Sequence, residues 1–365
     1  MSSRSYPKFA VVGAGHGGKA MAAHLGIMGF SVNLYKRQGA GLEKIKSRGG
    51  IELTGAVEGF GRLNVVSSNM KEVIDNVDVI MVVVPAHVHK SIAKDCAPHL
   101  QDGQIVLLNP GRTGGTLEFK NVLKKKGVTT KVKLAEAQTL IYTCRSTEPT
   151  SSRILSIKKS VPVAALPATE TENVLKVINE AYPRFTRAGS VLETGLNNIG
   201  AVFHPALVLL NSGRVHVMKG DFKFYTEGAT PYICRVIEVL DKERLDVADA
   251  FGVKAVAAKE WLSLTYGVEG KDLYETLQNN PAYKKINAPP HLEHRYIYED
   301  VPTGLVPLAS LGDIAQVSTP TMKGLVNVAS AMFATDFWSQ GRSAEALGIA
   351  GLTVKEIREL ILKGD

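Results

Sequence analysis

A glycine-rich turn near the start of the chain constrains the fold more than any other feature. Residues 13–18 are Gly-Ala-Gly-His-Gly-Gly, which matches the spacing G-x-G-x-x-G. The turn follows a short apolar run at 9–12 that is typical of a buried strand, and it opens a segment of helical composition at 17–28. A strand, this turn and a helix in that order begin a βαβ unit that binds a dinucleotide, whereas the spacing alone would be weak evidence.

Each glycine has a physical role in such a turn. Gly13 permits the tight turn, Gly15 lets the backbone approach a pyrophosphate, and Gly18 lets the helix lie close to the strand. The N-terminus of the following helix supplies free N–H groups and a partial positive charge for the phosphates. We therefore expect Gly13, Gly15 and Gly18 to bind a dinucleotide cofactor, the alternative being a glycine-rich turn without a ligand.

The residues after the second predicted strand indicate which dinucleotide is bound. That strand covers 31–35 and is followed by Lys36 and Arg37. An NAD site usually carries an acidic residue here to bind the ribose 2′-hydroxyl, and this sequence has none. Arg37 could instead make a paired contact with a 2′-phosphate, and Lys36 could act as a point charge. The sequence predicts a preference for NADP over NAD, and the alternative is two solvated side chains.

Strands and helices alternate through the first half of the chain. Continuous apolar strands between helices predict a parallel sheet covered on both faces, which is a doubly wound α/β domain of Rossmann type. We place this dinucleotide-binding domain at 1–187. The further strands are expected at 78–84, 104–108 and 132–137, and the further helices at 87–100 and 116–126.

The second half of the chain has a different pattern, because strand-like runs become scarce after about residue 185. We predict that 188–365 forms a mainly α-helical domain, which would carry the substrate and the catalytic residues. A total of 365 residues agrees with two domains of roughly 100–200 residues each. Helices are expected at 200–211, 233–251, 256–266, 321–333 and 354–363.

Charge, cysteine content and hydropathy exclude several classes of protein. The net charge is +8, but the basic residues are scattered and no nucleic-acid-binding signature accompanies them. The three cysteines lie far apart without a CxxC pair, which argues against a disulfide scaffold or a metal site. No apolar run reaches about 18 residues, and the short polar N-terminus leaves no room for a secretory signal. We expect a cytoplasmic protein that binds small molecules, not nucleic acid or membranes, and a homodimer through the helical domain stays open.

Two ionisable residues stand out in the predicted helical domain. His204 lies in an apolar helical run, and Asp300 lies in a segment of clustered charges and aromatic residues at 294–301. A single histidine in such a run is more often a core residue with satisfied hydrogen bonds than a catalytic group. Asp300 could equally belong to a surface turn, so the residues alone leave both alternatives open.

Several motifs taken together closely resemble the opine dehydrogenases, the octopine/nopaline dehydrogenase family. The resemblance covers nearly the whole chain, and the order and spacing of the motifs make chance agreement improbable. The motifs are the glycine turn, LNPGRTGG at 108–115, TCRS at 143–146, Asn198 with His204-Pro205, YTEG at 225–228 and HRYIYEDV at 294–301.

This resemblance implies an activity and a set of residue roles. Members of the family condense the amino group of an amino acid with a 2-oxo acid, often pyruvate, and reduce the imine with NAD(P)H to an N-(carboxyalkyl)amino acid. By resemblance, His204 is the catalytic acid/base and Asp300 orients it. Arg295 would hold a substrate carboxylate, and Asn198 would lie near the nicotinamide and the substrate. Gly200 departs from the Asn-x-Asn pattern of close relatives, which have a second asparagine at this position.

The implied chemistry suits these residue types. Histidine exchanges protons near neutral pH, a carboxylate at its other ring nitrogen fixes the tautomer, and arginine binds carboxylates in a bidentate manner. One alternative is a reductase like 2-dehydropantoate reductase or a 3-hydroxy acid dehydrogenase, which typically uses a lysine of the second domain. Another is a dinucleotide-binding sensor without catalysis. The set of His204, Asp300 and Arg295 argues against both.

Overall fold

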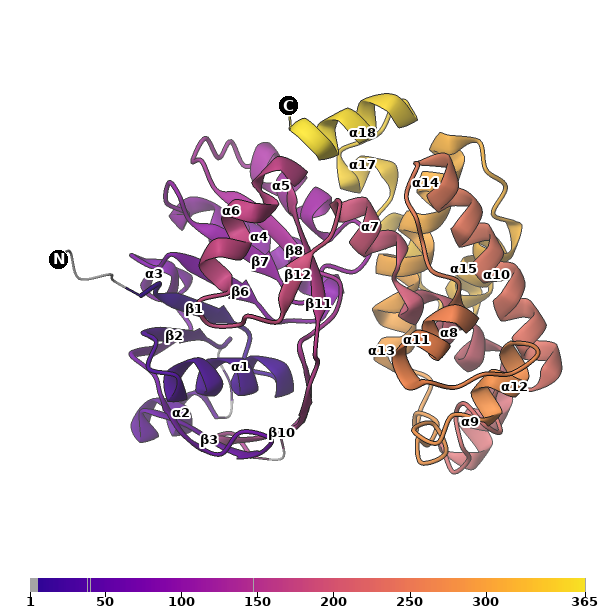
Figure 1. Cartoon of the computed structure of the whole chain (residues 1–365), viewed down its shortest axis with the longest axis horizontal. Coiled ribbons are helices and arrows are strands. Elements are labelled where there is room, and N and C mark those ends of the chain that lie inside the picture. Colours follow the sequence, from indigo (N-terminus) through magenta and orange to yellow (C-terminus); the bar gives the residue numbers. More distant parts are fainter. Residues whose placement is uncertain (1–5, 38, 40, 147, 365) are drawn as a thin grey trace. The chain divides into compact units, whose positions relative to one another are not determined.

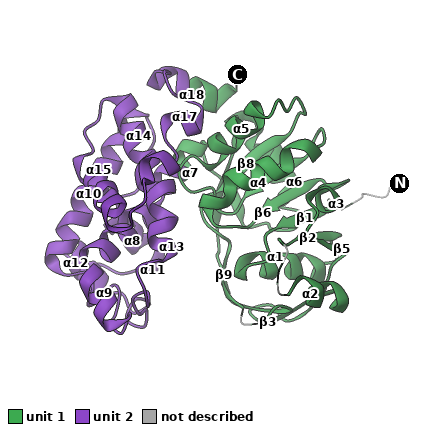
Figure 2. Cartoon of the chain, turned by 180° about the vertical axis from the view of Figure 1, so that it is seen from behind, with its two compact units in different colours: residues 1–194, 359–365 green, residues 195–358 purple. Residues whose placement is uncertain are grey.

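The computed structural model describes residues 6–37, 39, 41–146 and 148–364, and the chain divides into two compact units. Unit 1 consists of Met1–Thr194 and Glu359–Asp365, and unit 2 consists of Gly195–Arg358 (Figure 2). The last residues of the chain therefore belong to the same unit as its first half.

The strands of unit 1 form two sheets (Figure 1). Their bounds are β1 (Phe9–Val12), β2 (Val32–Tyr35), β3 (Gly50–Gly55), β4 (Gly59–Arg62), β5 (Val65–Ser67), β6 (Val79–Val82), β7 (Ile105–Leu108), β8 (Lys133–Ala137), β9 (Tyr142–Arg145), β10 (Ser151–Ile157), β11 (Val161–Leu166) and β12 (Phe185–Arg187). Within the described residues, the large sheet has eight strands in the order β12-β11-β8-β7-β6-β1-β2-β5. The small sheet has four strands in the order β4-β3-β10-β9.

Helices cover both faces of the large sheet. Phe9 and Val11 of β1 pack with α1, α2 and α6, whereas Ala10 and Val12 pack with α3, α4 and α5 on the opposite face. This arrangement confirms the predicted doubly wound fold. The bounds in unit 1 are α1 (His16–Ile27), α2 (Leu42–Arg48), α3 (Met70–Ile74), η1 (Ala86–Val88), α4 (His89–Cys96), η2 (Ala97–His99), α5 (Gly115–Lys125), η3 (Ala168–Glu170), α6 (Thr171–Ile178) and α7 (Val191–Leu196), the last of which ends in unit 2.

Two features of the sheets differ from the expectation. β11 runs antiparallel to β8, so one pair interrupts the otherwise parallel large sheet. The small sheet was not predicted at all, because none of its strands is a continuous apolar run. Glycines stand at both ends of β3 and at two of the four positions of β4, and buried residues alternate with exposed ones through the first half of β10.

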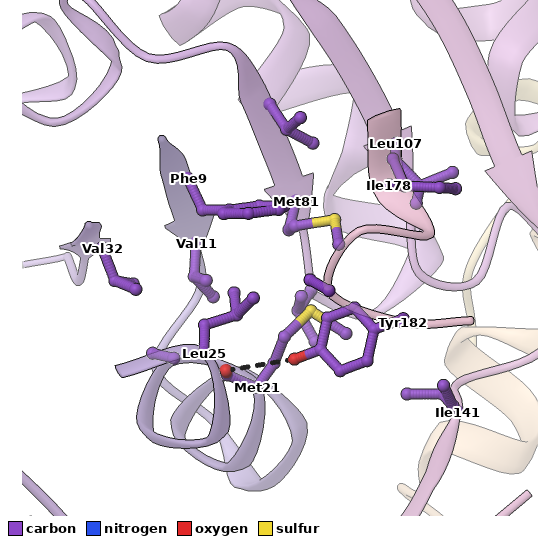
Figure 3. Packing of buried hydrophobic residues seen from close by; sticks show 14 of the residues in the cluster. Phe9, Val11, Met21, Leu25, Val32, Met81, Leu107, Ile141, Ile178 and Tyr182 are labelled. Carbon is purple, nitrogen blue, oxygen red and sulfur yellow. Dashed lines mark hydrogen bonds between the residues drawn. The ribbon is translucent and has the colours of Figure 1, made fainter. Parts of the chain in front are cut away.

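Helix α1 packs against both sheets. Its residues Met21 and Leu25 lie in the core beside Phe9 of β1 (Figure 3). On its other side, a Cβ atom at Gly61 of β4 would lie 2.1 Å from the carbonyl oxygen of Ala23, so only glycine allows this approach. The helix that follows the glycine turn is therefore held between two layers.

A chain of hydrogen bonds fastens the C-terminal half of α1. Tyr182 Oη donates to the carbonyl oxygen of Met21 at 3.4 Å, as Figure 3 shows, and Tyr142 Oη donates to Tyr182 Oη at 2.9 Å. His24 Nδ1 lies 2.8 Å from Tyr142 Oη, and this chain suits a proton on Nδ1. Burial lowers the pKa of His24 below its ordinary value.

The lowered pKa of His24 predicts how stability depends on pH. The folded protein takes up a proton at His24 less readily than the unfolded chain does. The contribution of neutral His24 to stability is therefore fully present above the unfolded pKa of about 6.5, and it is lost as the pH falls through the folded pKa. Each unit of depression corresponds to about 1.4 kcal/mol. Urea unfolding at about pH 7.5 and about pH 5.5, on either side of that pKa, should show a larger loss of stability for the wild type than for His24→Gln. Equal losses in the two proteins would contradict this prediction.

Unit 2 confirms the predicted mainly helical second half. In its described part, pairing of the strand type consists of one isolated bridge between Lys223 and Asn287. Nowhere in the described chain is a helix long and apolar enough to cross a bilayer. The bounds are α8 (Ile199–Leu210), α9 (Ser212–Met218), α10 (Pro231–Ala250), α11 (Ala258–Tyr266), α12 (Leu273–Gln278), α13 (Arg295–Tyr298), the π-helical turn η4 (Val301–Leu305), α14 (Val306–Ala315), α15 (Pro320–Met332), α16 (Phe337–Gln340), α17 (Ala344–Leu347) and α18 (Val354–Lys363), which ends in unit 1.

Candidate active site

The glycine turn leaves an open approach at its second glycine. Gly13 has φ +116°, and its N–H donates to the carbonyl oxygen of Tyr35 at 3.1 Å. A Cβ atom at Gly13 would lie 2.4 Å from the carbonyl oxygen of Val83, and one at Gly18 would lie 1.8 Å from that of Gly13. Both positions therefore require glycine. Around Gly15, a Cβ atom would meet nothing within 4 Å in the described structure, so a phosphate could approach this backbone.

The two cations chosen from the sequence lie beside this turn. Because β1 and β2 are parallel and Val12 pairs with Tyr35, the residues after the two strands meet at one edge of the sheet. Lys36 is half-buried there, and Arg37 is exposed. Arg37 Nη2 donates to Ser91 Oγ of α4 at 2.7 Å. The pair therefore lies at the sheet edge that also carries the glycine turn.

Lys19 is a third cation at this site, and no sequence pattern indicated it. It lies in the first turns of α1, where its N–H donates to the carbonyl oxygen of Gly15 at 3.0 Å. Its side chain is buried, and its Nζ donates to the carbonyl oxygen of Glu148 at 2.5 Å. Burial, and then repulsion by Lys36, lower the pKa of Lys19. A phosphate bound beside these two ammonium groups would relieve that repulsion. The donors present therefore fit a phosphorylated dinucleotide.

In unit 2, His204 and Asp300 meet although they lie 96 residues apart in the chain. His204 Nδ1 is 2.7 Å from Asp300 Oδ2. The aspartate side chain is fully buried, and the histidine side chain is 17% exposed. A carboxylate at Nδ1 holds the proton on that nitrogen and leaves Nε2 as the nitrogen that exchanges protons. This geometry would suit an oriented acid/base, and it differs from a histidine packed among apolar side chains.

A close contact between η4 and α8 places the two residues together. Asp300 directly precedes η4, and a Cβ atom at Gly304 within this turn would lie 2.5 Å from Ala201 Cβ. The glycine therefore lets η4 pack directly on the first turn of α8. Asn198 is buried at the N-cap of α8, with its Nδ2 3.5 Å from the same hypothetical Cβ atom. Asn198 thus lies in the contact that positions Asp300.

Two tyrosines complete the surroundings of His204. Tyr225 Oη lies 3.1 Å from His204 Nε2, and the Tyr296 ring stacks on the imidazole with the centroids 4.0 Å apart. Burial, followed by the neighbouring tyrosines, raises the pKa of Tyr225 well above its ordinary value, so its hydroxyl keeps its proton. Both tyrosines belong to motifs noted in the sequence, but nothing in the sequence assigned them a role.

Arg295 lies next to this group without joining it. It is the first residue of α13, directly before Tyr296, and its side chain is 55% exposed. In the described part of the chain, its ionic partner is the buried carboxylate of Glu299, with 3.0 Å between Nε and Oε2. Arginine has five N–H donors, so an ion pair at Nε leaves the terminal amino groups for another carboxylate.

The described residues provide neither a metal site nor a reactive thiol. Among the described residues, no three His, Cys, Asp or Glu side chains gather as metal ligands. Burial raises the pKa of the Cys144 thiol, and it raises those of Cys96 and Cys234 to about 12, so these thiols are poor nucleophiles. The histidine, aspartate and tyrosine group of unit 2 is therefore the strongest candidate for acid–base work.

Comparisons with known proteins agree with both halves of this description. A family model described as "NAD/NADP octopine/nopaline dehydrogenase, alpha-helical domain" matches residues 187–333. A model described as "NAD-dependent glycerol-3-phosphate dehydrogenase N-terminus" matches residues 8–131. An opine dehydrogenase of Arthrobacter sp. (strain 1C) is 37% identical over 354 residues, which are 97% of this chain and 98% of that protein.

Solved structures share the fold at lower identity. Octopine dehydrogenase in complex with NADH and agmatine has a TM-score of 0.82 and 20% identity, covering 98% of each chain. Yersinopine dehydrogenase with NADP+ bound has a TM-score of 0.73 and 15% identity, again covering 98% of each chain. The fold of this chain is therefore one that is found with either nicotinamide dinucleotide bound.

Proposed function

Because this chain belongs to the NAD/NADP octopine/nopaline dehydrogenase family, we propose that its His204–Asp300 pair performs the acid–base chemistry of an opine dehydrogenase. The chain is an NAD(P)-dependent oxidoreductase that acts on a CH–NH group. Its reaction joins the amino group of an amino acid to a 2-oxo acid and reduces the resulting imine. The observation that carries the proposal is the distance of 2.7 Å between His204 Nδ1 and Asp300 Oδ2.

His204 would move one proton twice during the condensation. Neutral at Nε2, it accepts a proton from the ammonium group of the amino acid, and the freed amine attacks the keto carbon. The resulting imidazolium is stabilised by the Asp300 carboxylate at Nδ1. It then returns the proton to the hydroxyl of the carbinolamine, and this hydroxyl leaves as water. The product is the iminium form of the imine, ready for reduction.

The cofactor would be held by residues of unit 1, with NADP preferred and NAD as the other nicotinamide cofactor. Gly13 and Gly18 shape the turn, Gly15 leaves room for the pyrophosphate, and Lys36 with Arg37 would bind the 2′-phosphate. When bound in its reduced form, the dinucleotide supplies the hydride that converts the iminium carbon to a CH group. Arg37 is exposed, and its hydrogen bond of 2.7 Å goes to the neutral Ser91 hydroxyl, which supports the availability of its charge to a phosphate.

Both substrates carry a carboxylate, and Arg295 is our candidate for binding one of them, with Asn198 near the reacting groups. Arg295→Ala should raise the KM of one substrate by about 10-fold to 100-fold, since a charge-assisted hydrogen bond contributes about 1.5–3 kcal/mol. It should change kcat much less, because the lost contact exists in both the ground state and the transition state. Lys355→Ala, which removes an exposed cation elsewhere in unit 2, serves as the control. An unchanged KM for both substrates would remove Arg295 from the site.

A test of the activity itself needs three assays. NADPH oxidation is followed with a 2-oxo acid alone, with an amino acid alone, and with both, using pyruvate first because a solved octopine dehydrogenase structure contains it. The proposed condensation requires both substrates, and the product should contain a secondary amine by mass spectrometry. Oxidation with the 2-oxo acid alone would instead favour the 2-dehydropantoate or 3-hydroxy acid type of reductase. Binding of NADPH without turnover on any pair in a matrix of substrates would favour the sensor.

A further inference from the structure

The groups around the imidazole of His204 determine how a proton could reach the substrate. Nδ1 faces Asp300, Nε2 faces the hydroxyl of Tyr225 at 3.1 Å, and one face of the ring stacks on Tyr296. The side chain as a whole is 17% exposed. The Tyr225 oxygen therefore lies within hydrogen-bond reach of the ring nitrogen that Asp300 leaves for proton exchange.

The Tyr225 ring is held firmly in this position. It stacks on Tyr283 with 4.1 Å between ring centroids and 18° between ring planes. Phe203 and Phe224 pack with it in edge-to-face geometry, with 6.4 Å and 5.0 Å between the ring centroids. Tyr225 is only 6% exposed, so its ring cannot swing away without breaking these aromatic contacts. The packing of the ring thus holds the Tyr225 hydroxyl next to His204 Nε2.

We propose that Tyr225 is a catalytic residue, and that its hydroxyl exchanges the proton with the substrate while His204 stores it. The inference rests on the proposed function and extends it, since it makes Asp300, His204 and Tyr225 a chain of three groups. Neutral Nε2 accepts a hydrogen bond from the hydroxyl, and protonated Nε2 donates one to the same oxygen. The contact therefore persists in both protonation states of His204.

The carbinolamine can lose water through these three groups without the formation of a Tyr225 phenolate. The C–O bond of the carbinolamine breaks, and its oxygen takes the proton of the Tyr225 hydroxyl to become water. In the same step, the Tyr225 oxygen takes the proton from His204 Nε2, and the imidazolium becomes neutral. The raised pKa of Tyr225 favours this concerted transfer over a free phenolate. His204 received this proton earlier by the reverse route, from the substrate ammonium group through Tyr225. The three groups therefore neither gain nor lose a proton over the condensation.

Tyr225→Phe tests this proposal because it removes the hydroxyl and keeps the ring that packs against Tyr283. We expect kcat and kcat/KM to fall by roughly 10²–10³-fold, within the range for loss of general acid–base catalysis. Tyr283→Phe is the matched control, since it removes a hydroxyl from the same aromatic cluster without touching His204. It should stay within about threefold of the wild type. The Tm and NADPH fluorescence report folding and cofactor binding for both variants.

A second measurement separates proton transfer from mere positioning. In mixtures of H2O and D2O, the rate of the wild type should depend on deuterium fraction along a curve, because two protons move in one step. In Tyr225→Phe the dependence should become linear. A Tyr225→Phe enzyme within threefold of the wild-type kcat, or a linear dependence in the wild type, would overturn the relay. If His204→Ala also kept its kcat, the proposed function would fail as well, whereas a large loss there with an intact Tyr225→Phe would overturn the relay alone.

Discussion

His204→Ala should lower kcat by roughly 10²–10⁴-fold, the usual cost of losing a general acid/base. NADPH binding should stay near that of the wild type, because the glycine turn and Lys36 belong to unit 1 and His204 belongs to unit 2. Steady-state kinetics give kcat, and quenching or enhancement of NADPH fluorescence gives the Kd. His216→Ala is a suitable control, since it removes an exposed histidine from the same unit.

Asp300→Asn should also lower kcat, because an amide at Nδ1 no longer stabilises the imidazolium and can favour the wrong tautomer. The double variant should be little slower than His204→Ala, since groups that act as a unit have non-additive effects. Multiplied losses in the double variant would mean that the two residues act separately. A near-normal kcat in His204→Ala would return this histidine to a structural role in the core of unit 2.

Reversing the charge beside β2 should have the second largest effect. In Lys36→Ala with Arg37→Asp, the Kd of NADPH should rise by at least about 10-fold to 100-fold, because even one charge-assisted hydrogen bond to the phosphate contributes about 1.5–3 kcal/mol. The Kd of NADH, which lacks the 2′-phosphate, should change much less. Lys19 would retain part of the affinity for both dinucleotides, since it remains near the first turn of α1.

The control for this pair is Lys124→Ala with Lys125→Asp at the exposed end of α5, which changes the net charge by the same amount. It should leave the ratio of the two Kd values unchanged. A wild-type enzyme that prefers NADH would contradict the prediction, and so would an equal loss of affinity for both dinucleotides in the Lys36 and Arg37 variant.

The sequence predicted the features of the fold that depend on local pattern. Continuous apolar runs identified β1, β6 and β7, and the glycine spacing located the start of α1. The small sheet was not predicted because its central pair, β3 with β10, joins segments that lie far apart in the chain. In addition, Gly61 of β4 is explained by its contact with α1 and not by strand propensity. Such a choice is visible only once the helix is in place.

Some residues of the candidate site could be predicted from the sequence, and others could not. His204 and Asp300 were selected by resemblance to a family, since 96 residues separate them and no local pattern pairs them. Tyr225 and Tyr296 stood in motifs of that resemblance, but their roles follow from tertiary contacts with the imidazole. Lys19 was missed because a lysine in a helix is ordinarily solvated, and its burial depends on the carbonyl oxygen of Glu148.

The placement of α1 between two sheets has a consequence for the thermodynamics of cofactor capture. A helix fixed on both sides, with Gly61 against Ala23 and the tyrosine chain at Met21, leaves the backbone around Gly15 little conformational entropy to lose when a ligand binds. The amide protons of α1 should accordingly exchange slowly with solvent before any dinucleotide is added. The entropy cost of ordering the backbone around the pyrophosphate therefore arises during folding and not during binding. Contacts that distinguish one dinucleotide from another then contribute more fully to the free energy of binding.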